Sequence, residues 1–226
     1  QQTLDEGLKA ALTANDQESV GLLLRHGADL NNFPNALANA VRSNDLNFVK
    51  LMLRAPKPLR PQIISSCLPA AVQQGSDATI SLLIAYGADP NFDSASALNM
   101  AIGRQAYKIA IALVAGPIPL NEPNLQHALD TTMRLPTRQA TLQFLQLLFC
   151  CGLPPDSRGL PDFLICLARS NDSAGAKMMV SYGVPTTVNG AECLREAIEN
   201  SNWSLVNAIS RPPSLPSMQQ QHYPCC

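Results

Sequence analysis

Cysteine and histidine are the side chains best suited to bind a metal ion or act as nucleophiles. The 226-residue chain contains seven cysteines and three histidines. The histidines, His26, His127 and His222, are far apart, and the pair Cys150-Cys151 has neither a histidine nor a second cysteine pair near it in the sequence. Because a zinc site needs three or four convergent ligands, we expect no metal site and no cofactor. One cysteine of the pair should be buried in a helix turn, and His26 should be structural.

The other cysteines indicate a reducing compartment. Cys67, Cys166 and Cys193 fall within apolar helical patterns, where a free cysteine behaves as a small hydrophobic residue. The odd total does not have the spacing of a disulfide framework, and no signal peptide is visible at the N-terminus. We therefore expect a cytoplasmic or nuclear protein. The terminal pair Cys225-Cys226 leaves two alternatives open, lipidation or an unmodified end.

Catalytic motifs are missing from the sequence. It has no glycine-rich loop followed by Lys-Ser/Thr for phosphate binding and no Gly-x-Ser-x-Gly turn. Carboxylates are thinly spread along the chain, and no obvious pair is formed by Asp130, Asp156, Asp162, Glu192, Glu196 and Glu199. We predict that the chain is not an enzyme, with no catalytic residues and no small-molecule substrate.

Composition limits the classes of partner. The formal net charge is −1 and only 15% of the residues are charged, so no strong field would attract nucleic acid. The most apolar run, residues 142–153, is too short to span a bilayer, and membrane contact is not expected. Aromatic residues make up 5% of the chain and hydrophobic residues 46%. This balance favours close packing of helices over a sheet.

One phrase occurs twice in the chain. "LLLRHGADLN" covers residues 22–31 and "LLIAYGADPN" covers 82–91, which places Gly27 and Gly87 sixty residues apart. That distance fits two units of about thirty residues, the scale of helical repeat proteins. Further copies of the surrounding pattern are therefore expected along the chain.

Each copy predicts a pair of helices. A first helix carries a small pair such as Ala10-Ala11, and a polar break such as Asn15-Asp16 suits a helix stop and an N-cap. A second helix carries an apolar stripe, as at Val20, Leu23 and Leu24, and a glycine ends it. The pattern predicts seven segments, at residues 4–31, 35–60, 63–91, 94–121, 122–156, 160–189 and 190–210. The fifth segment carries an insertion near Arg134–Arg138. Residues 211–226 form a separate tail rich in proline and glutamine.

The phrases "GADLN" (27–31) and "GADPN" (87–91), each after an apolar run, resemble the end of an ankyrin repeat. The Thr-Pro-Leu-His opening of that family is replaced by Asn35, Ala36, Leu37 and Ala38, so the repeats are divergent. The resemblance implies an all-α fold, an α-solenoid of about seven stacked helix-turn-helix ankyrin-like repeats over residues 1–210 with short connecting fingers. It also implies a concave face formed by the first helices and the fingers.

A partner would bind on that concave face. The polar positions after the small pair should form a stripe, although each alone could be an ordinary solvated helix end. The predicted stripe consists of Arg42, Ser43, Gln73, Gln74, Arg104, Asp130, Arg169 and Glu199. The arginines would pair with carboxylates of the partner. Phe33 and Phe92, in the fingers, would be aromatic anchors or would pack beneath the next repeat.

The leading hypothesis is a non-catalytic scaffold that binds a protein or peptide on the concave face. The alternative is a regulatory or substrate-docking segment of a larger multidomain enzyme or receptor. In a variant of that alternative, the Pro-rich tail occupies the groove as an autoinhibitor.

Overall fold

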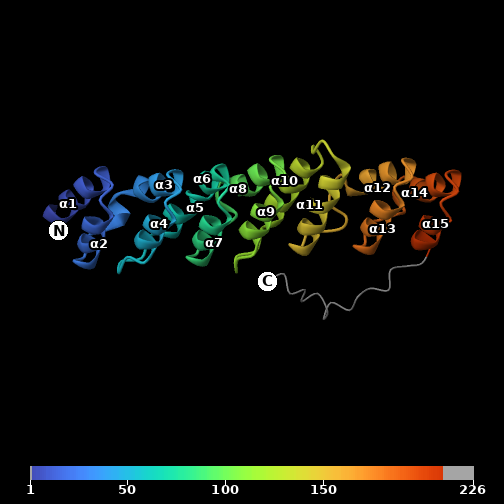
Figure 1. Ribbon diagram of the computed structural model, residues 1–226. Coiled ribbons are helices and arrows are strands. Elements are labelled where there is room, and N and C mark those ends of the chain that lie inside the picture. The colour runs from blue at the N-terminus through green and yellow to red at the C-terminus, as the bar shows by residue number, and fades with distance from the viewer. Residues whose placement is uncertain (1, 211–226) are drawn as a thin grey trace. The chain divides into compact units, whose positions relative to one another are not determined.

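The computed structural model describes residues 2–210 of the chain (Figure 1). These residues form an all-α fold, and no strand occurs within that range. The tail of residues 211–226, with His222 and Cys225-Cys226, lies outside the described residues, and so does its predicted role as an autoinhibitor.

The helices of residues 2–210 follow one another as seven pairs, with one short additional α-helix. The first helices of the pairs are α1 (Gln2–Thr13), α3 (Pro34–Arg42), α6 (Leu68–Gln74), α8 (Phe92–Gly103), α10 (Glu122–Thr132), α12 (Leu160–Arg169) and α14 (Val188–Glu199). The second helices are α2 (Gln17–Arg25), α4 (Leu46–Leu53), α7 (Asp77–Ala85), α9 (Tyr107–Val114), α11 (Arg138–Cys150), α13 (Ser173–Ser181) and α15 (Trp203–Ser210). The insertion of the fifth segment forms a longer turn between α10 and α11.

The polar breaks form the turns inside the pairs, as predicted. In three pairs an asparagine takes the left-handed conformation, with φ between 55° and 58°: Asn15, Asn44 and Asn171. The next residue in each case caps the second helix by accepting a hydrogen bond from a backbone N–H three residues later: Asp16, Asp45 and Asp172. Bonds from the side chain and backbone of Ser19 lower the pKa of Asp16 below its ordinary value. An ionised aspartate at a helix N-terminus is favourable because it accepts this bond and faces the positive end of the helix dipole.

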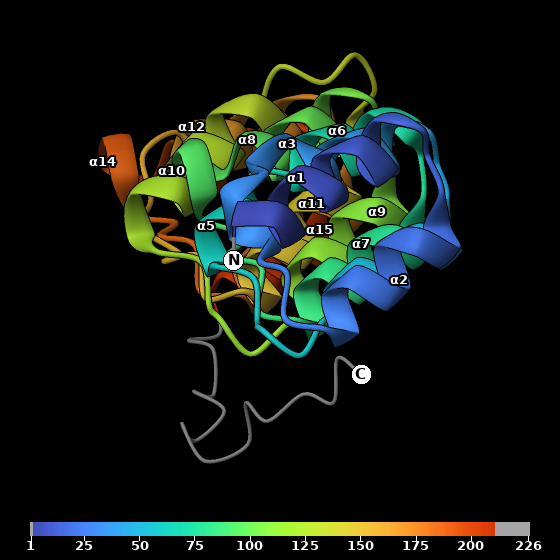
Figure 2. The same cartoon turned by 90° about the vertical axis from the view of Figure 1, so that its left-hand side faces the viewer.

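The chain divides into two compact units, Gln1–Asn124 and Leu125–Cys226. In the N-terminal unit each first helix packs on the second helix of its own pair, and neighbouring pairs also pack on one another. Among the first helices, α3 packs on α6 and α6 on α8; among the second helices, α2 packs on α4, α4 on α7 and α7 on α9. Figure 2 shows α1, α3 and α6 in one layer and α2, α7 and α9 in the other. The core lies between the layers, at residues such as Leu8, Val20, Ile80 and Leu98.

The C-terminal unit has the same pattern of contacts. Helix α12 packs on α14 and α13 on α15, and α12 also contacts α13 as α14 contacts α15. Phe144, Leu164, Leu167 and Met179 are at most 1% exposed. A single pair of helices could not bury these side chains by itself, so the contacts between pairs complete the core.

Two local elements were not predicted. The short helix α5 (Pro61–Ser65) precedes α6, and Pro61 suits its first turn because the fixed φ of proline is helical and its missing N–H is not needed there. Helix α8 begins with three left-handed residues, Asp93, Ser94 and Ala95, with φ of 51–54°. The Nδ2 of Asn99 donates to the carbonyl of Ser94 at 3.1 Å.

The repeated phrase ends a helix and closes a turn. Gly27 has φ 93° and ends α2, in the left-handed conformation that glycine adopts without strain. Asp29 then accepts hydrogen bonds from the backbone N–H and the side-chain amide of Asn31, both at 2.9 Å. The backbone bond from Asn31 is the main cause that lowers the pKa of Asp29 below its ordinary value. The turn around Leu30 is a 3-10 helix, η1 (Leu30–Asn32), in place of a β-hairpin.

The asparagine of the phrase reaches the next pair of helices. Asn31 donates from Nδ2 to the carbonyl of Pro58 at 3.1 Å, and its Oδ1 accepts from the N–H of Arg60 at 2.8 Å. Leu59, between these two residues, is 8% exposed. Because a side-chain amide can donate and accept at once, Asn31 bonds two backbone groups of the later connection.

The second copy of the phrase makes the same bonds and adds one. Asn91 donates from Nδ2 to the backbone carbonyl of Pro119 at 2.9 Å and to the carboxylate of Asp89 at 3.0 Å. Its Oδ1 accepts from the N–H of Asn121 at 2.8 Å and from Nδ2 of Asn124 at 3.0 Å. We call the two copies, Asp29–Asn31 and Asp89–Asn91, the Asp-x-Asn clamps. Their bonds explain why the phrase recurs, since each clamp joins its helix pair to the next.

Candidate interaction surface

The predicted stripe residues of the N-terminal unit are exposed at the C-terminal ends of the first helices. Arg42 ends α3, and its Nη1 donates to Oδ1 of Asn39 at 2.9 Å. Ser43 follows it and donates to the carbonyl of Ala40 at 3.0 Å. Gln73 and Gln74 end α6, and no hydrogen bond of their side chains occurs within the described residues. These side chains are available at the surface.

Arg104, also in the stripe, contacts the neighbouring pair of helices. Its Nη1 lies 3.3 Å from the carbonyl oxygens of Val72 and of Gln73, which are at the C-terminal end of α6. A guanidinium at this place adds donors to carbonyls at the end of the helix and complements its dipole. Arg104 therefore links α8 to α6, and only part of its donor set faces outward.

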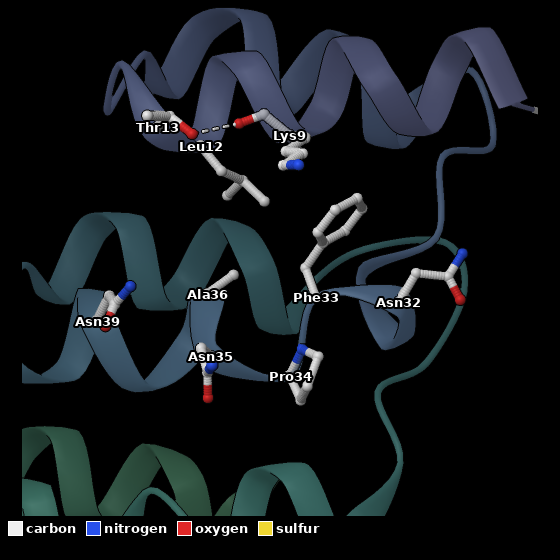
Figure 3. Close-up of a pocket in the computed structure, with 9 residues that line it drawn as sticks. All are labelled: Lys9, Leu12, Thr13, Asn32, Phe33, Pro34, Asn35, Ala36 and Asn39. Atoms are coloured by element: carbon white, nitrogen blue, oxygen red, sulfur yellow. Dashed lines mark hydrogen bonds between the residues drawn. The ribbon is translucent and has the colours of Figure 1, made fainter.

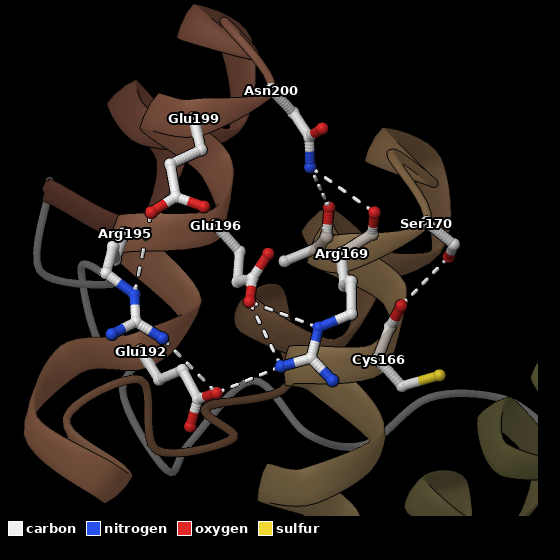
Figure 4. Close-up of polar contacts among 9 residues, drawn as sticks. Cys166, Arg169, Ser170, Glu192, Arg195, Glu196, Glu199 and Asn200 are labelled. Atoms are coloured by element: carbon white, nitrogen blue, oxygen red, sulfur yellow. Dashed lines mark hydrogen bonds and ion pairs between the residues drawn. The ribbon is translucent and has the colours of Figure 1, made fainter.

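The stripe residues of the C-terminal unit lie in an ion-pair network (Figure 4). Nε and Nη2 of Arg169 lie 3.1 and 3.0 Å from Oε1 of Glu196, and Nη2 also lies 3.0 Å from Oε1 of Glu192. Arg195 lies 3.6 Å from Glu192 and 3.8 Å from Glu199. The hydrogen bond with Glu196 is the main cause that raises the pKa of Arg169. The expectation that these carboxylates are scattered was wrong for three of them, because α14 carries Glu192, Glu196 and Glu199 within two turns, around Arg195 and the Arg169 of α12.

The same surface contains a second link between α12 and α14. Asn200 donates from Nδ2 to the carbonyls of Ala168 and Arg169, at 3.1 and 3.3 Å. This bond repeats the contact that Arg104 makes in the N-terminal unit. The remaining stripe residue, Asp130, is exposed on α10 and accepts a hydrogen bond from Gln126 at 3.1 Å.

The two predicted aromatic anchors lie in different surroundings. Phe92 is 37% exposed at the start of α8. Phe33 is half-buried, and Figure 3 shows its ring projecting from the start of α3 toward Lys9 and Leu12 of α1. The ring borders a groove of about 530 Å³ between α1 and α3. The groove is lined by Lys9, Leu12, Thr13, Asn32, Phe33, Pro34, Asn35, Ala36 and Asn39.

The sequence analysis did not identify this groove. Its floor is made by Leu12, Phe33 and Ala36, which are all half-buried, and its rim by exposed polar side chains. Asn35 and Asn39, four residues apart, could have signalled one polar strip along α3. That these two residues face a groove beside α1 depends on how the helices pack, which a local sequence pattern does not show.

The cysteines divide into buried and exposed thiols. Burial raises the pKa of Cys67 and of Cys193 to about 11, so neither thiol is a nucleophile near neutral pH. Cys166 is exposed, although its apolar surroundings in the sequence predicted burial. Cys150 is exposed and Cys151 half-buried, so the expectation of one buried member was also wrong. Both exposed thiols lie on helix positions that face away from the core, which a short apolar run does not reveal.

A metal centre would need several ligands close together. Within residues 2–210, no group of three or more histidine, cysteine, aspartate or glutamate side chains is arranged to hold a metal ion. Nor does any helix of that range combine the length and the apolar character needed to cross a bilayer.

The sequence was also compared with known proteins. No protein-family model matches the chain, and no curated protein matches it.

Proposed function

We propose that this chain is a non-catalytic scaffold of ankyrin-like repeats that binds a protein or peptide on the face formed by its first helices. The packing of α3 on α6 and of α6 on α8 supports the proposal most directly. It places the exposed ends of neighbouring first helices beside one another, with Arg42, Gln73 and Gln74 at the surface. The two Asp-x-Asn clamps support the resemblance to ankyrin repeats.

A surface built in this way suits binding. The first helices are held by core contacts, by the clamps and by the bonds from Arg104 and Asn200. A surface already fixed in the free protein loses little conformational entropy when a partner binds. Its polar groups would set the choice of partner through hydrogen bonds and charge.

A cytoplasmic or nuclear location is part of the proposal. The five cysteines of the described residues are all free thiols, as expected for a protein that works in a reducing compartment.

The test compares two double variants in affinity capture from the source lysate. One, Arg42→Glu with Gln74→Glu, changes exposed side chains on the first helices α3 and α6. The control, Glu18→Lys with Lys108→Glu, changes exposed side chains on the second helices α2 and α9. We expect the first variant to lose a specific partner by about tenfold or more, because misplaced charge in an interface is strongly unfavourable.

The control variant should keep the same partner, and both variants should stay folded with only a small fall in melting temperature, since each reverses a charge at a helix end. Loss of the partner from the control alone would place the binding surface on the second helices and contradict the proposal.

A further inference from the structure

The groove between α1 and α3 combines three features that together define a ligand. It has an apolar floor, a rim of neutral carboxamides on α3, and one ammonium group on α1. Its volume of about 530 Å³ falls within the range of about 300–1,000 Å³ that is usual for binding pockets. All the residues that line it belong to the N-terminal unit.

The carboxamides are spaced to hold a peptide backbone. Asn35 and Asn39 are one helical turn apart on α3, which separates them by about 6 Å along the axis. In an extended peptide, alternate residues are about 6.6–6.8 Å apart and present their N–H and C=O groups to the same side. A carboxamide can donate to a carbonyl and accept from an N–H at once. Two such side chains therefore match two alternate residues of an extended chain lying along the groove.

One of these amides is already oriented. Arg42 donates from Nη1 to Oδ1 of Asn39 at 2.9 Å, so the oxygen of Asn39 faces the guanidinium and its Nδ2 donors are left for a ligand. Asn35 makes no side-chain hydrogen bond to any of the described residues. The donors and the acceptor that a peptide backbone needs are thus present on one edge of the groove.

Charge specifies the peptide further. Lys9 is exposed on the opposite rim, and its ammonium forms no ion pair with any residue in the range 2–210. It is the only charged residue that lines this groove, and the positive charge of Arg42 lies just beyond Asn39. Figure 3 shows Lys9 above the ring of Phe33, at the end of the groove where α3 begins. Asp5, one turn before Lys9 on α1, also lies near that end, where its carboxylate accepts a hydrogen bond from Nδ2 of Asn32 at 3.2 Å. Lys9 has no such partner among the described residues, so it is the charged group left to pair with a carboxylate of a ligand.

We propose that this groove binds an extended peptide segment of a partner protein that carries an apolar side chain and, within two residues of it, an acidic one. The apolar side chain packs on Leu12, Phe33 and Ala36, the carboxylate pairs with Lys9, and Asn35 and Asn39 hold the backbone. This inference rests on the proposed function, since it names the kind of partner that the first-helix face would take.

The test uses a displayed library of random 12-residue peptides, selected on the full chain. Enriched peptides are then synthesised with a fluorescent label and titrated by anisotropy. We expect enrichment of an apolar residue with an aspartate or glutamate within two positions. The variant Lys9→Glu should weaken binding by about tenfold, because an attraction becomes a repulsion. Changing the acidic residue of the peptide to lysine should restore binding to Lys9→Glu.

Matched controls separate the groove from the rest of the surface. The variant Asn35→Ala with Asn39→Ala should weaken binding by about fivefold or more, since two sets of hydrogen bonds are lost. Asn47→Ala with Asn207→Ala and the single change Lys108→Glu alter exposed residues of the same types on second helices, and they should leave the affinity unchanged.

Failure of the inference can be told apart from failure of the proposed function. Peptides that bind both groove variants as tightly as the unchanged chain would overturn the inference, and so would a selection that enriches no peptide. The capture experiment with Arg42→Glu and Gln74→Glu tests the proposed function, whereas Lys9→Glu and Asn35→Ala with Asn39→Ala test the groove. A partner lost from that variant, together with either negative peptide result, would leave a scaffold that binds elsewhere on its first helices.

Discussion

Replacing Asn91 by alanine is expected to lower the free energy of unfolding by about 2–4 kcal/mol, since several hydrogen bonds to partly buried groups disappear together. Asn91 bonds the connection that follows α9 at the carbonyl of Pro119 and the N–H of Asn121. It also accepts from Asn124, which is only 6% exposed. Alanine would leave the buried amide of Asn124 with only a weak bond at 3.3 Å to the backbone carbonyl of residue 91.

The measurement is urea denaturation followed by far-UV circular dichroism, with Asn31→Ala as the matched control. Asn31 occupies the same place in the first clamp but has no buried amide that depends on it, so we expect a smaller loss of about 1–2 kcal/mol. A double-mutant cycle of Asn91→Ala and Asn124→Ala should give a coupling of about 1 kcal/mol. Equal losses for Asn91 and Asn31, with no coupling, would show that Asn124 does not depend on Asn91, and no loss from either variant would show that the clamps do not hold the next pair.

Replacing Phe144 by alanine is expected to have the largest effect of all, a loss of about 3–5 kcal/mol, which is typical when a large buried side chain leaves a cavity. Phe144 is 1% exposed on α11 and is among the largest fully buried side chains of the described residues. The loss should fall on the C-terminal unit, to which α11 belongs.

Hydrogen exchange read by mass spectrometry can show where this loss falls. We expect faster exchange in Phe144→Ala for peptides from residues 125–210. The control is Phe149→Ala on the same helix, where the half-buried ring stacks on Tyr182 with centroids 4.5 Å apart. That stack contributes about 0.5–1.5 kcal/mol, so Phe149→Ala should cost much less. Similar effects of both variants would mean that Phe144 does not lie in a closed core.

The helix pairs could be predicted because their signals are local in the sequence. A helix stop followed by an N-cap, as at Asn44 and Asp45, acts on residues within one turn of the break. The same is true of Gly27, whose left-handed conformation ends the helix next to it. For these elements a short window contained all the groups that take part.

The contacts between pairs could not be predicted in this way. The Asn31 clamp bonds to Pro58 and Arg60, almost thirty residues later, which is far outside a short window. A signal was nevertheless present, since Pro58-Leu59 and Pro119-Leu120 follow the two Asp-x-Asn phrases at nearly equal distances. Only the structure shows that these prolines accept the hydrogen bonds.

The candidate surface was predicted in outline. The exposure of Arg42, Gln73 and Gln74 agrees with the expected stripe, although their contact with a partner stays a prediction. Arg104 and Arg169 were predicted to pair with a partner, but in the structure each is bonded to groups of the neighbouring helix pair. Long side chains at helix ends reach acceptors on the next pair, and a one-dimensional pattern does not say whether such an acceptor is in range.

The most direct test of the scaffold is photo-crosslinking from single positions of the intact chain. A photoreactive amino acid at Gln73 would report on the first-helix face, and one at Leu22, which is 50% exposed on α2, on the second-helix face. We predict that Gln73 gives a specific cross-linked protein partner in source lysate and that Leu22 gives none. Cross-linking of that partner from Leu22, with none from Gln73, would contradict the assignment of the binding surface to the first helices.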